Sequence, residues 1–187
     1  MSTTTAPTFR EFPKIARLNR ECIITEKVDG TNGCIVVTDG GVWAQSRNRV
    51  LVEDTDPFGF ALWVEQNKDA LRSVLGPGYH FGEWFGRGIQ RGYGMDVRRF
   101  ALFNVDRWAT APLCDGLTTV PILYDGLFRT NAVEDALALL REDGSKIAPG
   151  FMRPEGVVVY HIAAEVGFKV TLERDAGRKA RTETEGR

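Results

Sequence analysis

The sequence is poor in histidine and cysteine, and its formal net charge is only −1. Its two histidines do not lie near any cysteine in the sequence, so no zinc site is predicted. The cysteines Cys22, Cys34 and Cys114 are odd in number and form no CxxC pair. We therefore expect reduced, mostly buried thiols in a cytoplasmic protein.

Targeting and membrane signals are also missing. The N-terminal run MSTTTAPT has neither a basic start nor an apolar stretch, which excludes a signal peptide at this position. The longest apolar run, 157–164, contains a histidine and is too short to cross a bilayer. With a pI near 6.2 the chain has no overall positive field, so contact with nucleic acid would need a local basic stripe.

What the chain does contain is material for one α+β domain. It has 187 residues, of which 43% are hydrophobic and 10% aromatic, enough for a substantial core. We expect a domain over 19–173, between a flexible segment 1–18 and a charged, frayed tail 174–187. Hydrophobic alternation and turn signals predict strands at 21–28, 34–38, 42–45, 80–84, 100–106, 121–124, 157–161 and 167–172.

Two helices are predicted among these strands. Asp56 and Pro57 are typical of a helix start, and apolar spacing continues the helix to Leu75. A second helix is expected from Asn131, with Glu134 reaching back in a capping box.

The first candidate for chemistry is Lys27, in the run EKVDGTNG. A lysine at the end of a buried strand, before a glycine turn, would be held rigidly with its amine facing a cleft. Burial favours the neutral amine, which is a nucleophile. The alternative is a surface lysine beside an ordinary β-turn.

Five further positions follow in order. Arg47 offers a fork of donors for a phosphate, Glu83 can accept hydrogen bonds from ribose, and Phe103 can stack on a purine. Glu155 stands at the entrance of a valine-rich strand, where a carboxylate can hold a divalent cation, and Lys169 can neutralise phosphate charge.

Each position has an ordinary alternative when taken alone. Phe103 is compatible with a core residue, Arg47 with a solvated charge, and Glu83 and Glu155 with turn residues. Lys169 could pair with Glu173. The order and spacing of all six positions favour a shared site.

These motifs resemble the covalent nucleotidyltransferase superfamily of ATP-dependent ligases and mRNA capping enzymes, and more narrowly the RNA ligase 2 family. KVDGTN at 27–32 is similar to the family's nucleophile motif, Ser46-Arg47 to its second motif, and FGEWFGRGIQRGYG at 81–94 to its third. Phe103, Glu155-Gly156 and Phe168-Lys169 fit the later motifs. The resemblance covers about residues 20 to 172 and implies an ATP-grasp-like ligase adenylation domain, with antiparallel sheets flanked by helices.

The resemblance also implies an activity and a set of roles. It implies an ATP-dependent RNA ligase that joins a 3′-hydroxyl to a 5′-phosphate, at nicked duplexes or broken single strands, with Mg²⁺ or Mn²⁺. The implied catalytic residues are Lys27, as nucleophile on the α-phosphate of ATP, together with Asp29 and Lys169. The implied nucleotide-binding residues are Lys27, Asn32, Arg47, Glu83, Phe103, Glu155, which also assists the metal, and Lys169.

The sequence departs from the family in two ways. Thr171 stands where the last motif usually has a second lysine, a loss for which Arg174 could substitute. Family members commonly carry an additional domain that engages the nucleic acid, and no segment of this sequence corresponds to it. We expect end joining to need a separate RNA-binding partner protein or a pre-activated end.

A cluster of arginines indicates where RNA would bind. Arg87, Arg91, Arg98 and Arg99 surround Tyr93, which could stack on a base. Arg47 would contact the RNA end, and the alternative for the cluster is a solvated loop. Three other functions stay open at this point: a DNA ligase, a GTP-using capping-type enzyme, and a nucleotide-binding module that has lost ligation.

Overall fold

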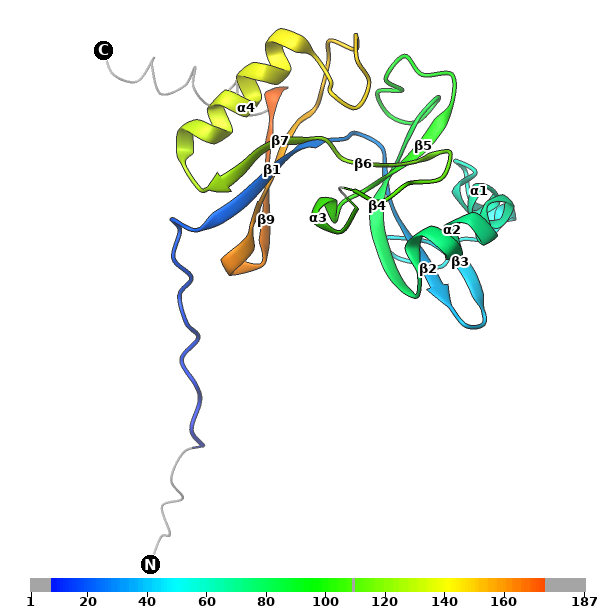
Figure 1. Ribbon diagram of the computed structural model, residues 1–187, viewed down its shortest axis with the longest axis horizontal. Coiled ribbons are helices and arrows are strands. Elements are labelled where there is room, and N and C mark those ends of the chain that lie inside the picture. The colour runs from blue at the N-terminus through cyan, green and yellow to red at the C-terminus, as the bar shows by residue number, and fades with distance from the viewer. Residues whose placement is uncertain (1–7, 109, 174–187) are drawn as a thin grey trace, which may run out of the picture.

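The computed structural model describes residues 8–108 and 110–173, and they form two sheets that lie side by side (Figure 1). The four-stranded sheet has the order β7-β1-β8-β9 and the five-stranded sheet the order β3-β2-β4-β5-β6. All neighbours pair antiparallel except β5 and β6, which are parallel. The expected α+β class with helices flanking the sheets is confirmed.

The four-stranded sheet carries one long helix on one face. Its strands are β1 (Glu21–Lys27), β7 (Ile122–Leu127), β8 (Gly156–His161) and β9 (Val166–Thr171), and the helix is α4 (Thr130–Asp143). Alternate residues of β1 and β8, such as Ile24 and Val159, pack with Ala136 and Leu140 of the helix. The opposite face of β1 and β8 is thereby left toward the other sheet.

The five-stranded sheet is also covered by helices on one face. Its strands are β2 (Thr31–Thr38), β3 (Gly41–Ser46), β4 (Gly78–Gly86), β5 (Arg98–Leu102) and β6 (Leu117–Thr119), and the helices are α1 (Phe60–Gln66) and α2 (Lys68–Leu75). Phe60, Leu71 and Leu75 of the helices pack against Phe100 and Ile35 of the sheet. The short elements are α3 (Val105–Trp108) and the 3₁₀ turns η1 (Glu53–Thr55) and η2 (Ile162–Ala164).

Two predicted elements differ from the structure. The helix expected after Asp56 is divided at Asn67, whose Nδ2 donates to the carbonyl of Trp63, 2.8 Å away, and Pro57 precedes the helix. The helix start expected at Asp56 is wrong, because Gly59 is the N-cap, although Asp56 Oδ2 accepts a hydrogen bond from Ala61 N in the first turn at 2.6 Å. The strand expected over 100–106 ends at Leu102 and gives way to α3.

Smaller differences concern β6, which no sequence signal indicated, and the start of α4. That helix begins at Thr130, with Arg129 at its N-cap and no side-chain cap bond. Asn131 therefore lies inside the first turn, and the capping position that was expected for it is wrong.

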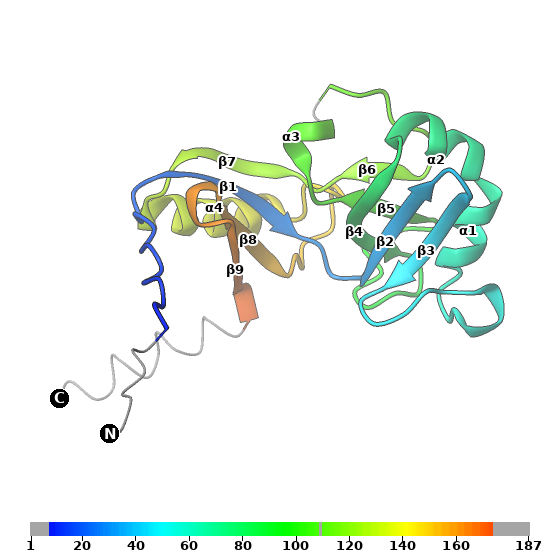
Figure 2. The same cartoon turned by 90° about the horizontal axis from the view of Figure 1, so that it is seen from below.

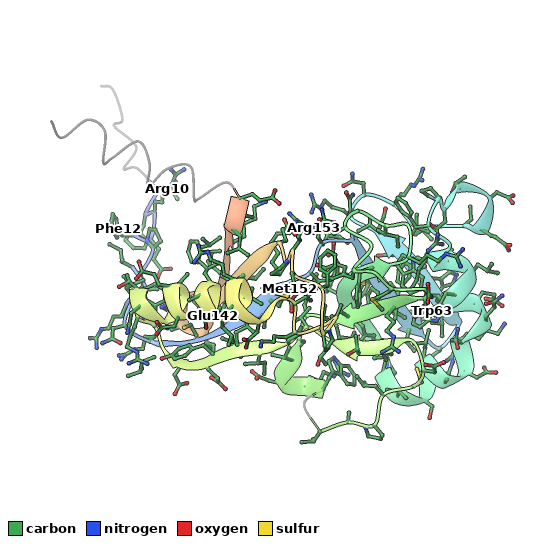
Figure 3. All side chains as sticks on the ribbon, turned by 90° about the horizontal axis from the view of Figure 1, so that it is seen from above. Arg10, Phe12, Trp63, Glu142, Met152 and Arg153 are labelled. Atoms are coloured by element: carbon green, nitrogen blue, oxygen red, sulfur yellow. The ribbon has the colours of Figure 1, made fainter. Side chains whose placement is uncertain are left out.

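The first described residues lie apart from the sheets (Figure 1). Residues 8–18 run off the body, and Arg10 and Phe12 project from this segment (Figure 3). The tail 174–187, including Arg174, lies outside the described residues. Within 8–108 and 110–173, no helix has the length and apolar character that crossing a membrane requires.

The connection between the sheets determines where a site can form. β1 belongs to one sheet and β2 to the other, and residues 28–30 join them (Figure 2). Lys27 is the last residue of β1, so its side chain stands at the junction.

Candidate active site

A cleft of about 1090 Å³ lies at the junction of the two sheets. Seven of the site residues predicted from sequence line it: Lys27, Asp29, Asn32, Arg47, Glu83, Phe103 and Lys169. They come from β1, the loop after it, β2, the end of β3, β4, the end of β5 and β9. A cleft of this volume is of the size that holds a nucleotide.

Lys27 is held at this cleft by an ion pair. Its Nζ lies 2.6 Å from Oε2 of Glu155, and the two side chains are 23% and 17% exposed. The backbone explains the meeting, because Lys27 pairs with Gly156 across β1 and β8 and Glu155 directly precedes that strand. Glu173, the alternative partner considered for Lys169, pairs with Arg91 at 3.0 Å.

The loop after Lys27 lies against β4, which explains its glycine. A Cβ atom on Gly30 would stand 2.3 Å from the carbonyl oxygen of Trp84, closer than real contacts allow. Only glycine lets the loop approach this closely, so that Gly30 N can donate to Oε1 of Glu83 at 3.1 Å. The glycine of the nucleophile motif thus connects the loop to the predicted ribose-binding carboxylate.

Glu83 is a nearly buried carboxylate in the wall of the cleft. It is 7% exposed, and its Oε2 accepts a hydrogen bond from Asn32 Nδ2 at 2.8 Å. Arg47 donates to Oδ1 of the same asparagine. Burial raises the pKa of Glu83 to about 7, an effect that its hydrogen bond with Gly30 partly offsets.

This raised pKa predicts a pH dependence of stability. Between the ordinary carboxyl pKa near 4.5 and about 7, folded Glu83 holds a proton that the unfolded chain has lost. The contribution of Glu83 to folding stability is therefore present in full below the pKa of the unfolded chain, and it is lost as pH rises through the pKa of the folded state. The free energy of unfolding should fall by up to about 3 kcal/mol from this group between pH 5 and pH 8.

Urea unfolding of wild type and Glu83→Gln at both pH values measures this effect. Glutamine does not titrate, so the variant should lose less stability than wild type as pH rises. Glu142→Gln, an exposed glutamate on α4, is the control and should follow wild type. Equal pH dependence in wild type and Glu83→Gln would contradict the prediction.

Phe103 and Lys169 stand on opposite sides of the cleft. Phe103 is the first residue after β5, is 43% exposed, and its backbone N donates to the carbonyl of Phe81 at 3.0 Å. Lys169 lies exposed on β9 opposite Val158, which also lines the cleft. A flat ring and a cation on facing sheets fit a purine and its phosphates.

The expected stacking of a base on Tyr93 is wrong. Tyr93 is 3% exposed, its ring packs against Phe85 and Phe151, and its hydroxyl accepts a hydrogen bond from Asp29 N at 2.6 Å. Desolvation of this buried phenol raises its pKa. Tyr93 instead supports the loop that follows Lys27.

The arginine cluster is only partly a free basic surface. Arg91 pairs with Asp29 at 2.9 Å and donates to the carbonyl of Arg153, so its guanidinium joins the loop after Lys27 to the segment that precedes β8. Arg98 donates to the carbonyls of Arg87 and Phe58. Arg87 and Arg99 are exposed, but neither lines the cleft.

Glu26 is a site residue that sequence reasoning missed. It is 1% exposed and accepts hydrogen bonds from Ser145 Oγ at 2.6 Å, Lys146 N at 2.7 Å and Ile147 N at 3.0 Å. Burial raises the pKa of this carboxyl, against these hydrogen bonds. Glu26 fixes the loop after α4 to the strand that carries Lys27, and a glutamate beside a lysine gives no sequence signal of that role.

A metal ion at this site would need ligands from a substrate in addition to protein carboxylates. Among the described residues, no group of three or more His, Cys, Asp or Glu side chains is placed to hold a metal ion. Mg²⁺ at phosphoryl-transfer sites commonly takes one or two carboxylates and fills its shell with phosphate oxygens and water. Glu155, beside Lys27, can supply such a carboxylate.

Comparison with solved structures supports the fold. The chain is similar to variants of the Naegleria gruberi RNA ligase. For one with ATP and Mn, the TM-score is 0.62 at 20% identity, with 92% of this chain and 59% of that chain covered. A second variant with ATP and Mn has a TM-score of 0.59 at 21% identity, with 86% of this chain and 51% of that chain covered. A variant with AMP and Mn has a TM-score of 0.60 at 20% identity, with 92% of this chain and 59% of that chain covered. The chain thus spans between half and three-fifths of these structures.

No curated protein matches the chain. The family model described as RNA ligase matches residues 20–172, which include both sheets and every predicted site residue. The chain therefore belongs to the RNA ligase family.

Proposed function

We propose that this chain is the adenylation domain of an ATP-dependent RNA ligase of the RNA ligase 2 type, and that Lys27 forms a covalent lysyl-AMP. The observation that carries the proposal is the position of Lys27 Nζ, which stands at the cleft lined by Glu83, Arg47, Phe103 and Lys169. An amine, a ribose acceptor, a stacking ring and two cations are the groups that a nucleotidyl transfer needs.

The chemistry proceeds in three transfers. Nζ of Lys27 loses a proton and bonds to the α-phosphorus of ATP, and the bond to pyrophosphate breaks. A 5′-phosphate oxygen then takes the AMP from Lys27, and a 3′-hydroxyl displaces AMP to leave a phosphodiester. Because only the neutral amine attacks, the ion pair with Glu155 must open before the first bond forms.

The other residues bind and orient the substrate. Glu83, held by Gly30 N and Asn32, presents carboxylate oxygens to the ribose hydroxyls, and Phe103 covers the adenine. Arg47 and Lys169 offset phosphate charge from the two sides of the cleft. A divalent cation beside Glu155 would supply further neutralisation of the phosphates.

Intact mass tests the proposal. Purified protein incubated with ATP and Mg²⁺ or Mn²⁺ should gain the mass of one AMP, and GTP should give no adduct. Binding of ATP without an adduct would point instead to a nucleotide-binding module, and a GMP adduct to a capping-type enzyme.

The polymer is tested separately. The chain spans only part of its solved relatives. The test therefore uses ends that already carry AMP, and it compares the sealing of RNA with that of DNA of the same sequence. RNA should be sealed faster, and the reaction should improve when a separate RNA-binding protein holds the ends. Faster sealing of DNA would overturn the assignment of RNA as the substrate, but it would not affect the assignment of Lys27 as the nucleophile.

A further inference from the structure

One face of the five-stranded sheet is covered by α1 and α2, and the other carries exposed aromatic rings. Side chains alternate along β4, so Tyr79, Phe81 and Glu83 share the face opposite the helices. Trp43 of β3 and Tyr79 of β4 both pair with Val36 of β2, and directly paired residues project from one face. We call Trp43, Tyr79 and Phe81 the aromatic platform.

The exposure of this platform is unusual for large apolar groups. Trp43, Tyr79 and Phe81 are 42%, 62% and 59% exposed, whereas Cys34 and Val36 of the strand between them are 3% and 5% exposed. Neither α1 nor α2 covers this face, and α3 reaches it only near β5, where Val105 packs with Ala101. Contiguous exposed rings of this kind commonly mark a binding surface.

The rings are arranged to receive flat groups. Those of Tyr79 and Phe81 lie 6.4 Å apart between centroids and only 18° from parallel. Successive aromatic faces of this kind stack on the bases of single-stranded nucleic acid, and every base offers such a face. A duplex already stacks its bases internally, so the platform favours unpaired nucleotides.

The platform is continuous with the proposed nucleotide site. Tyr79 and Phe81 line the same cleft as Lys27, and the backbone of Phe81 accepts the hydrogen bond from Phe103. Along β4 the order runs from Glu83, at the proposed ribose, to Phe81 and then Tyr79. Nucleotides stacked on these rings would lead directly to the amine that carries AMP.

Cations stand at both ends of this path. Arg47 is at the end near Glu83. Arg107 lies at the far end, where it donates to the carbonyl of Leu75 at 3.0 Å and its guanidinium lies 4.6 Å from the ring centroid of Trp108. Asp106 also lines the cleft, so the path is not uniformly basic. Two fixed guanidinium groups that flank a row of rings suit the phosphates on either side of stacked bases.

We propose that the aromatic platform binds the unpaired nucleotides of the RNA end that is to be joined. This rests on the proposed function, because the reason for a strand at this face is its delivery to Lys27. The rings supply stacking, and Arg47 and Arg107 hold the backbone. A protein partner would be a different occupant, and the parallel rings and flanking cations favour nucleic acid.

The test compares two readouts on one set of variants. Fluorescence anisotropy measures the Kd for a 5′-phosphorylated single-stranded RNA of about 12 nucleotides, within the range that such surfaces cover. Intact mass measures lysyl-AMP formation on the same preparations. Tyr79→Ala and Phe81→Ala should each weaken RNA binding about tenfold, and adduct formation should stay at the wild-type level.

Three further variants separate stacking from charge and from folding. Phe81→Leu keeps apolar bulk and loses the ring, so it should also weaken binding. Arg107→Gln should lower the slope of log Kd against log salt by about one, whereas the ring variants should leave that slope unchanged. Phe12→Ala, an exposed ring on the N-terminal segment, is the matched control and should bind like wild type.

The outcomes separate this inference from the proposed function. Wild-type Kd values in Tyr79→Ala and Phe81→Ala would overturn the platform, and so would equal binding of a blunt duplex of the same sequence. Failure of the wild-type chain to form any adduct would overturn the proposed function, while a ring-dependent Kd for the single strand would still support the platform.

Discussion

Replacing Lys27 by alanine is expected to abolish the covalent adduct with AMP completely. The bond is made by Nζ, and no nearby group can replace it: Lys169, the other lysine that lines the described cleft, belongs to β9 on the opposite side of β8 from β1. Intact mass after incubation with ATP and a divalent cation measures the effect. Any remaining AMP adduct in Lys27→Ala would remove this lysine from the mechanism.

The control must show that loss of the adduct is not loss of the fold. Lys68 is the matched residue, because it also pairs with a glutamate, Glu65, at 2.5 Å and lies on α2 away from the cleft. Lys68→Ala should form the adduct as wild type does. Lys27→Ala leaves Glu155 without its ion-pair partner, so a modest drop in thermal stability is expected, with the circular dichroism of the folded state retained.

The sequence allowed the site to be predicted where its residues fall into short local runs. Lys27 was predicted at a cleft from its place at the end of a buried strand before a glycine turn, and Asp29 and Asn32 were added by the resemblance; all three line the cleft. Glu83 and Lys169 were placed by resemblance and by the position of their strands. Glu83 and Lys169 meet at one cleft because β4 and β9 belong to the two sheets that the loop between β1 and β2 joins.

The sequence did not reveal roles that depend on packing between distant segments. Tyr93 follows an arginine-rich loop and reads as a surface ring, yet φ of 54° and contacts with Phe85 and Phe151 turn it into the core. Arg91 reads as an RNA contact, yet its partner Asp29 lies 62 positions earlier in the chain. Glu26 is satisfied by a loop about 120 positions away, and no local spacing encodes such a contact.

The predicted end of the strand over 100–106 is wrong for a related reason. The stretch 100–106 has the alternation of a strand, but Asn104 Oδ1 accepts a hydrogen bond from Arg107 N at 3.4 Å and helps to start α3. This turn takes Phe103 out of the strand and exposes it at the cleft. Because β5 ends at Leu102, the ring of Phe103 is free of the strand and accessible in the cleft, which supports its proposed contact with adenine.

Glu155→Gln is expected to slow adduct formation by about 10²- to 10³-fold, the second largest effect. Glutamine has nearly the same shape but no charge, so it keeps a contact with Lys27 and loses both the 2.6 Å ion pair and the proposed metal-associated carboxylate. Single-turnover rates of adduct formation at increasing Mg²⁺ concentrations measure the change. If Glu155 assists the metal, the variant should require more Mg²⁺ as well as react more slowly. A slower rate with wild-type Mg²⁺ dependence would restrict Glu155 to orienting Lys27, and Glu142→Gln, exposed on α4, should match wild type in both measurements.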